Sequence, residues 1–279
     1  MPDLFQYSFV VRAFIAGGIV GLISPLLGTF LVLRRLSLIA DALAHVALAG
    51  AVVGLLLDRS PVFIAVGVSA VAAVALEYLR AKRRLEGDSA LALLLYTALA
   101  ITVVLVSLRG GFNADLFGFL FGSVITVGRT DVWATVGLGV AVLLTTWVLY
   151  TELVQSTFDP ELARVSGIHV GLTNLVLAIL TAVTVTLSMR VVGALLVGAL
   201  IVFPVLASLQ LRQSFRVTLL VASSIGVVSV FAGLTISYYQ NIAAGGAIVL
   251  VALGFLLLTS LGRKLTSGRI TVEAPEANK

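Results

Sequence analysis

The sequence predicts an all-α, polytopic membrane protein with eight or nine transmembrane helices. Of its 279 residues, 60% are hydrophobic and only 11% are charged, whereas soluble domains carry about 25% charged residues. Apolar runs of about 18 residues or more recur along the whole chain, and each is long enough to cross the hydrocarbon of a bilayer. The alternating pattern of a membrane β-barrel is absent, so we expect helices, which satisfy their own backbone groups.

Charged and turn-forming clusters divide the chain into nine predicted spans. They lie near residues 13–33, 36–57, 61–80, 89–108, 131–150, 171–189, 191–211, 215–237 and 242–262. The sixth and seventh are the least separated, because the connection from Ser188 to Gly193 has few polar residues for a turn in water. Eight spans is the alternative, and it would reverse the side of one terminus.

The distribution of Lys and Arg predicts the orientation. With nine spans, five of the 18 basic residues share the side of the N-terminus, which leaves 13 on the other side. The five are Arg12, Arg59, Arg109, Arg129 and Arg190. The side with 13 is cytoplasmic by the positive-inside rule, so the N-terminus is predicted outside the cell membrane and the C-terminus inside. The net charge of +5 then reflects helix flanks rather than a surface for nucleic acid.

The chain is predicted to form one transmembrane domain over residues 1–265, because no domain-separating linker interrupts it. The polar tail, residues 266–279, is predicted to be disordered and cytoplasmic. The N-terminus lacks a basic region, so no cleaved signal peptide is expected. The chain has no cysteine, which excludes a disulfide framework, a thiolate metal site and a Cys nucleophile.

Asp41 and His45 are the most informative residues, because they stand four apart within an apolar span, LSLIADALAHVALAG at 36–50. Four residues is about one helical turn, so both side chains lie on one helix face. An ionisable side chain at the centre of a span costs roughly 2.5–3.5 kcal/mol and should face a cavity, a partner or a pathway. Imidazole with carboxylate suits zinc, and the carboxylate also suits manganese or iron.

Two interpretations of this pair stay open. Asp41 and His45 could hydrogen-bond each other and hold the bundle together. Alternatively, they could form a transient metal site, because two ligands are too few for a tight zinc site, which normally has four. Water or a second copy of the chain would then complete the coordination.

A polar stretch on the predicted cytoplasmic side, within 151–170, reads as a short helix. Asp159 is suited to cap it, Pro160 to occupy its first position, Glu161 to favour its positive end, and Gly167 to end it. It could dock in a soluble partner or lie on the membrane as an amphipathic connector. His169 is interpreted as a solvated loop residue.

Several catalytic motifs are missing from the sequence. It contains no G-x-x-x-x-G-K-[ST] phosphate loop and no H-E-x-x-H zinc motif. Its spans also lack the dense acid and histidine chains of a proton-driven pump. The chain is therefore not predicted to be an enzyme, and any energy from ATP must come from a separate subunit.

Several segments together resemble the permease subunits of ATP-binding-cassette (ABC) importers for zinc and manganese, the ABC-3 metal permeases. The resemblance covers roughly residues 12–262 and depends on the order and spacing of six segments. They are LVLRRLSLIADALAHVALAG at 31–50, EGDSALALLL at 86–95, DLFGFLFGSV at 115–124, FDPELARVSG at 158–167, VVGALLVGALIVFPVLAS at 191–208 and GLTISYYQNIAAGGAIVLV at 233–251. The family's usual Asp-x-Pro before the last span is replaced by residues 240–242, Gln-Asn-Ile.

The resemblance implies a type II importer fold, similar to that of the cobalamin and iron-siderophore permeases. It implies a second copy of the permease, or a similar permease, lining one path, with two cytoplasmic ATPase subunits and an extracytoplasmic metal-binding protein. Asp41 and His45 would lie in the metal path, with no permanently bound cofactor. The segment that meets the ATPase would present Phe158, Asp159, Glu161, Arg164 and Gly167.

Three functions follow as hypotheses. The first is an ABC permease for a divalent transition metal, with zinc favoured over manganese because residues 47–50, Ala-Leu-Ala-Gly, look like those of the zinc members. The second is a secondary cation transporter that works without ATP. The third is a membrane scaffold that transports nothing and whose polar pair is purely structural.

Overall fold

The structure is a computed structural model that describes residues 6–81, 87–108, 114–123 and 127–267. Within these ranges it contains twelve helices and no strand. The helices are α1 (Ser8–Leu33), α2 (Ile39–Leu56), α3 (Pro61–Ala81), α4 (Gly87–Leu108), α5 (Ala114–Phe121), α6 (Arg129–Val148), α7 (Tyr150–Phe158), α8 (Pro160–Val165), α9 (Val170–Ser188), α10 (Val197–Gln210), α11 (Phe215–Gln240) and α12 (Ala244–Ser267).

Eight of the described helices are long and apolar enough to cross a membrane: α1, α2, α3, α4, α6, α9, α11 and α12. The seventh predicted span, 191–211, was one of the two least separated spans, and it contains α10, an apolar helix of only 14 residues. The predicted all-helical membrane fold with eight or nine spans is therefore confirmed. The seventh predicted span was drawn too long, because residues 191–196 precede α10 as turns rather than as helix.

The turns before α10 are held by the end of α5. The Ala194 N–H donates to the carbonyl of Phe119 at 2.8 Å, and the Leu195 N–H donates to that of Leu120 at 3.2 Å. Gly193 has a φ of +92°, and a Cβ there would lie 2.4 Å from the Leu120 carbonyl oxygen. Non-helical backbone is tolerated at membrane depth only where protein or water satisfies its polar groups. Here α5 supplies that protein.

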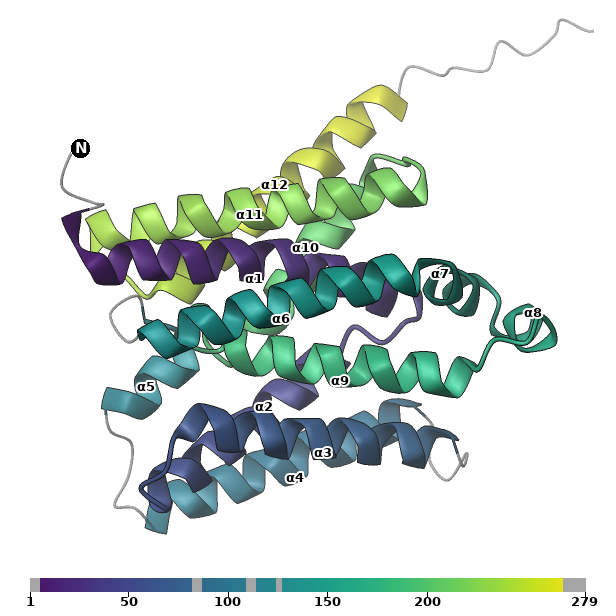
Figure 1. The fold of residues 1–279 in the computed structure, drawn as a ribbon. Helices are drawn as coiled ribbons and strands as arrows, with labels where there is room; N and C mark the ends of the chain where they lie inside the picture. The colour runs from purple at the N-terminus through teal and green to yellow at the C-terminus, as the bar shows by residue number, and fades with distance from the viewer. Residues whose placement is uncertain (1–5, 82–86, 109–113, 124–126, 268–279) are drawn as a thin grey trace, which may run out of the picture.

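The bundle has a buried centre and exposed flanks. In the 18-residue apolar stretch of α2, 72% of the residues are buried within the chain, whereas in that of α4 only 22% are buried. Helix α2 is therefore part of the core, whereas α4 lies at the edge of the bundle, as Figure 1 also shows. Helices α1 and α11 pack closely because Gly21 faces Gly226, where an added Cβ would lie 2.9 Å from the Gly226 carbonyl oxygen.

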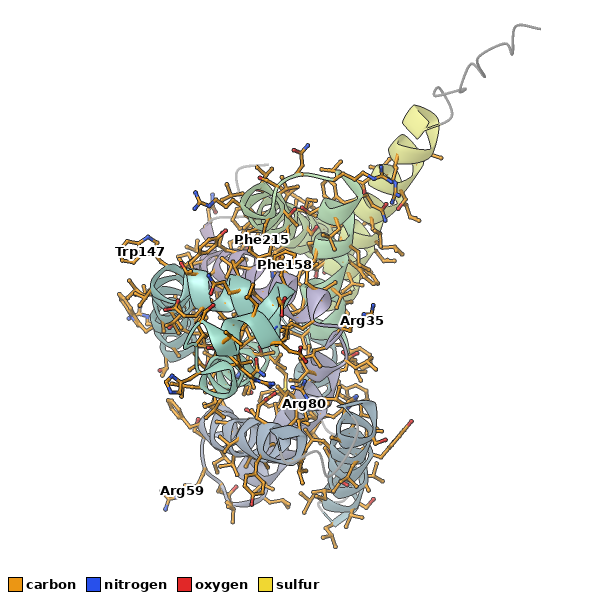
Figure 2. All side chains as sticks on the ribbon, turned by 90° about the vertical axis from the view of Figure 1, so that its right-hand side faces the viewer. Arg35, Arg59, Arg80, Trp147, Phe158 and Phe215 are labelled. Atoms are coloured by element: carbon orange, nitrogen blue, oxygen red, sulfur yellow. The ribbon has the colours of Figure 1, made fainter. Side chains whose placement is uncertain are left out.

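The described chain begins and ends at opposite ends of the bundle, which agrees with the eight long helices if the shorter α10 is counted as a ninth crossing. Figure 1 shows the start of α1 on the left, and α7, α8 and the end of α12 on the right. The right-hand end is called the basic end below, because Arg34, Arg35, Arg80 and Arg164 line a cavity there (Figure 2). The positive-inside rule predicts that this end is cytoplasmic. Helix α12 continues to Ser267. The rest of the predicted tail, 268–279, lies outside the described residues.

Candidate metal site and coupling helix

Asp41 lies in the first turn of α2 and packs against α10. A Cβ added to Gly198 would lie 1.9 Å from Asp41 Oδ1 and 2.8 Å from its Cγ. Only glycine leaves room for the carboxylate at this point of α10. The half-buried Asp41 therefore occupies a niche between two helices that lie far apart in the sequence.

His45 follows one turn later on the same helix and is also half-buried. Its Nδ1 atom is buried and has no hydrogen-bond partner. Within the described part of the chain, no hydrogen bond joins His45 to Asp41. A buried polar atom without a partner costs about 1–3 kcal/mol and calls for an explanation. The interpretation of the pair as a mutually hydrogen-bonded brace is thus not what the structure contains.

The two side chains could supply two donors to a cation, a carboxylate oxygen and an imidazole nitrogen. In the described ranges, no group of three or more His, Cys, Asp or Glu side chains is placed to hold a metal ion. One chain alone therefore offers only part of the four-ligand set that a tight zinc site needs. Such a partial site suits a metal that is held briefly rather than stored.

The short helix predicted on the cytoplasmic side is present as α8. The Asp159 carboxylate caps it by accepting the N–H groups of Glu161 and Leu162 at 3.1 and 2.9 Å. Pro160 occupies the first turn, and Gly167 ends the segment with a φ of +85°. Each of these positions has the local chemistry that the sequence predicted.

The outer surface of this segment is apolar as well as charged. Phe158 is 62% exposed and packs edge-to-face on Phe215, with ring centroids 5.6 Å apart, as Figure 2 shows from the basic end. Leu162 and Val165 are 62% and 86% exposed. They lie three residues apart, alongside the predicted contacts Glu161 and Arg164, which are also exposed. Sequence reasoning missed these two apolar residues, although their spacing on a short capped helix was the available signal.

Arg34 is a second feature that sequence reasoning missed, because it was counted only as a flanking charge. Its guanidinium donates to Thr157 Oγ1 and Ser156 Oγ, both at 2.9 Å, and to the Leu153 carbonyl at 3.2 Å. It also donates to Asn174 Oδ1. The turn between α1 and α2 is therefore joined to α7 and α9, some 120–140 residues further along the chain.

Burying the charged guanidinium of Arg34 has an electrostatic cost. Burial lowers the pKa of Arg34 from its usual value to about 10, with Glu77 opposing the shift and Arg80 adding to it. The guanidinium stays charged at neutral pH, so its desolvation is offset by the four acceptors around it. Arg34 thus lies at a point where α7, α9 and the turn before α2 meet.

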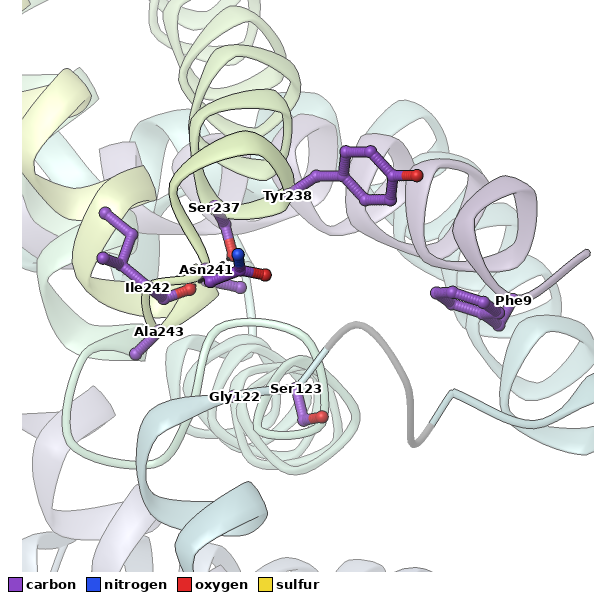
Figure 3. Close-up of a pocket in the computed structure, with 9 residues that line it drawn as sticks. Phe9, Gly122, Ser123, Ser237, Tyr238, Asn241, Ile242 and Ala243 are labelled. Atoms are coloured by element: carbon purple, nitrogen blue, oxygen red, sulfur yellow. Dashed lines mark hydrogen bonds between the residues drawn. The ribbon is translucent and has the colours of Figure 1, made fainter. Parts of the chain in front are cut away.

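The opposite end of the bundle contains a cavity of about 610 Å³, shown in Figure 3. Its nine lining residues include Phe9, Ser123, Tyr238 and Asn241, and none of them is charged. Asn241 ends α11 in the left-handed conformation, with a φ of 53°. This turn is where the sequence departs from the Asp-x-Pro of the family it resembles. The described residues around this cavity offer no carboxylate to a cation.

The eight long apolar helices are those of a multi-pass cell-membrane protein. The chain matches the ABC 3 transport family over residues 6–263, and it therefore belongs to this family. It is 35% identical to the "Manganese transport system membrane protein MntC" of Halalkalibacterium halodurans, over 90% of this chain and 86% of that protein. It is 30% identical to the "High-affinity zinc uptake system membrane protein ZnuB" of Haemophilus influenzae, over 93% and 99%.

A solved structure has the same fold. The structure of "PsaBC from Streptococcus pneumoniae in complex with Fab" superposes with a TM-score of 0.82 at 29% identity. The match covers 92% of each chain. The architecture predicted from the resemblance, that of an ABC importer permease, is confirmed.

Proposed function

We propose that this chain is the permease subunit of an ABC importer for a divalent transition metal, and that Asp41 and His45 hold the metal during passage. The observation that carries the proposal is the environment of Asp41 and His45 within the core helix α2. The His45 Nδ1 atom is buried without a hydrogen-bond partner, and the Asp41 carboxylate lies in a niche that Gly198 leaves open. Imidazole and carboxylate groups are common metal ligands, and these two do not hydrogen-bond each other.

The proposed assembly follows from what one chain lacks. The sequence has no phosphate loop, so two cytoplasmic ATPase subunits would hydrolyse the ATP. One chain offers two donors, and a second copy across a shared path would raise the number to four. An extracytoplasmic metal-binding protein would deliver the ion at the end that carries the cavity beside Asn241.

The proposed mechanism is alternating access. Metal enters from the outer end, Asp41 and His45 hold it transiently, and ATP-driven movement of α8 opens the cytoplasmic side. The contacts of Arg34 support a route for this movement, because they link α7, which leads into α8, to the turn five residues before α2. The exposed side chains of Phe158, Leu162 and Val165 would form the apolar part of the contact with the ATPase.

Between the two metals, we propose zinc, on the sequence of residues 47–50. The relatives carry names for both metals, so uptake by competition is the decisive measurement. Cells that depend on this transporter should take up labelled zinc in the presence of excess manganese, and excess unlabelled zinc should block that uptake. Equal inhibition by both metals would contradict the preference for zinc without affecting the role of the pair.

The ligand role is tested with the double variant Asp41→Ala/His45→Ala. Metal uptake at limiting concentration should be lost, because no other described side chains form a cation site. Asp58→Asn is the control, since it removes an exposed carboxylate at a position with a φ of 50°, which Asn tolerates. Both variants must be present in the membrane at equal levels. Wild-type uptake by the double variant would show that Asp41 and His45 do not bind the metal during passage.

The secondary-transporter hypothesis makes a different prediction for the purified chain. A secondary transporter reconstituted alone would move metal without ATP. The proposed importer requires the ATPase, and its ATP hydrolysis should rise when the metal-loaded binding protein is added. Metal movement by the chain alone would favour the secondary transporter, and failure to move metal in either arrangement would favour the scaffold.

A further inference from the structure

A second cavity, about 400 Å³ in volume, lies at the basic end of the bundle. It is formed by the α1–α2 turn, the end of α3, the α7–α8 junction and the start of α9. Four arginines line it: Arg34, Arg35, Arg80 and Arg164. Figure 2 looks onto this end and labels Arg35 and Arg80. Among the described residues that line it, none is acidic.

The positive charge around this cavity is only partly balanced. Arg80 forms an ion pair with Glu77, and Arg34 uses neutral acceptors. Arg35 and Arg164 make no side-chain hydrogen bond or ion pair with any described residue. Like charges within a few ångströms of one another repel, and Arg80 indeed contributes to the lowered pKa of Arg34. An anion in the cavity would relieve this repulsion.

The depth of the cavity and its apolar wall indicate the kind of anion. Leu33 is the last residue of α1 and Val170 the first of α9, so the cavity begins where the apolar spans end. This is the level of lipid headgroups. Leu33, Leu36 and Val170 give the cavity an apolar side next to its arginines. Its volume exceeds what a bare phosphate ion fills, and basic pockets between cytoplasmic helix ends suit phospholipid headgroups.

We propose that this basic cavity is a binding site for a phosphate group, with the headgroup of an anionic phospholipid of the cytoplasmic leaflet as its source. Guanidinium groups bind phosphate through paired, charge-assisted hydrogen bonds. In a phosphatidylcholine headgroup, the positive charge of the choline would repel the arginines and weaken this binding. Arg164 belongs to α8 and Arg35 to the α1–α2 turn. A bound headgroup would therefore bridge the coupling helix and the segment that leads to Asp41.

The chain offers a matched pair of variants for the test. Arg35 and Arg212 are both exposed arginines with left-handed backbone, at φ of 59° and 50°, and only Arg35 lines the cavity. Asn tolerates this conformation, so Arg35→Asn and Arg212→Asn remove equal charge without adding backbone strain. The full-length protein, purified in neutral detergent, is titrated with phosphatidylglycerol, phosphatidylcholine or inorganic phosphate. Thermal unfolding is followed by tryptophan fluorescence.

Phosphatidylglycerol should raise the melting temperature of the wild-type protein and of Arg212→Asn, and phosphatidylcholine should not. For Arg35→Asn, the apparent affinity for phosphatidylglycerol should fall about tenfold, the effect of one charged contact. Arg35→Lys, which keeps the charge but loses the paired geometry, should fall between the two. A response to inorganic phosphate as strong as that to phosphatidylglycerol would keep the phosphate site and assign it a soluble ligand.

Two results would overturn the proposal. One is an equal loss of lipid response in Arg35→Asn and Arg212→Asn, which would reduce the effect to general surface charge. The other is an unchanged response of Arg35→Asn to both anions together with weaker co-purification of the ATPase. That outcome would indicate that an acidic side chain of the ATPase, and not a lipid phosphate, occupies the cavity. Neither readout depends on metal transport, so the proposed importer function stands or fails separately.

Discussion

Replacing Gly198 by alanine should disable the metal site without removing a ligand. The new Cβ would lie 1.9 Å from Asp41 Oδ1, and ordinary contact begins at 3.4 Å, so the carboxylate must move by about 1.5 Å. Metal sites tolerate deviations of only about 0.2 Å in ligand distance. Disturbing the support of a ligand typically costs about 10–100-fold in metal affinity. Uptake at limiting metal should fall by a similar factor.

The assay is uptake of labelled metal by cells that depend on this transporter, corrected for the amount of protein in the membrane. Gly254→Ala is the matched control, because Gly254 lies within helix α12 and has open space where a Cβ would be. In a helix, Ala is favoured over Gly by roughly 0.5–1 kcal/mol, so neither substitution weakens its own helix. Gly254→Ala should transport normally.

A double-mutant cycle separates this explanation from simple misfolding. If Gly198→Ala acts by displacing Asp41, it should cause no further loss in an Asp41→Ala background, because coupled residues are not additive. Wild-type uptake by Gly198→Ala would refute the reasoning, since the site would then tolerate a displaced carboxylate. Fully additive losses would refute it too, because the two substitutions would then act independently.

Three other perturbations have clear expected outcomes. Glu161→Lys should reduce co-purification of the ATPase and its stimulation, because it reverses an exposed charge on the proposed contact; unchanged ATPase binding would favour a membrane-surface role for α8. Arg34→Met should lower the unfolding free energy by about 1.5–3 kcal/mol, the value of charged hydrogen bonds, as measured by chemical denaturation in detergent. Asn241→Val should destabilise by about 1–3 kcal/mol because valine resists a positive φ, whereas Asn241→Gly should leave the melting temperature nearly unchanged.

Local patterns in the sequence were sufficient for most of the fold. Span lengths follow from hydropathy, and they place α1, α2 and α9 near their predicted positions. The cap of α8 was predictable because Asp159, Pro160 and Gly167 act within a few residues of one another. The shared face of Asp41 and His45 was predictable for the same reason, since it requires only that the segment be helical.

The remaining features depend on contacts between segments distant in sequence. Hydropathy does not predict the break before α10, because the turns at 191–196 are as apolar as a helix and two of their N–H groups, those of Ala194 and Leu195, donate to α5. The niche of Asp41 depends on Gly198, whose absence of a side chain matters only once α2 and α10 meet. Arg34 looked like any flanking charge, since its partners Thr157 and Asn174 lie more than 120 residues away.

The short α10 has a consequence for how the protein is made. At about 1.5 Å per residue, its 14 residues span about 21 Å, which is less than the roughly 30 Å of a bilayer core. In the turns before it, the Ala194 and Leu195 N–H groups donate to carbonyls of α5, a segment that leaves the ribosome much earlier. We therefore expect α10 to enter the lipid together with α5 and not as an independent unit. Its integration has to wait until the preceding helices have assembled, which makes the order of synthesis part of the folding mechanism.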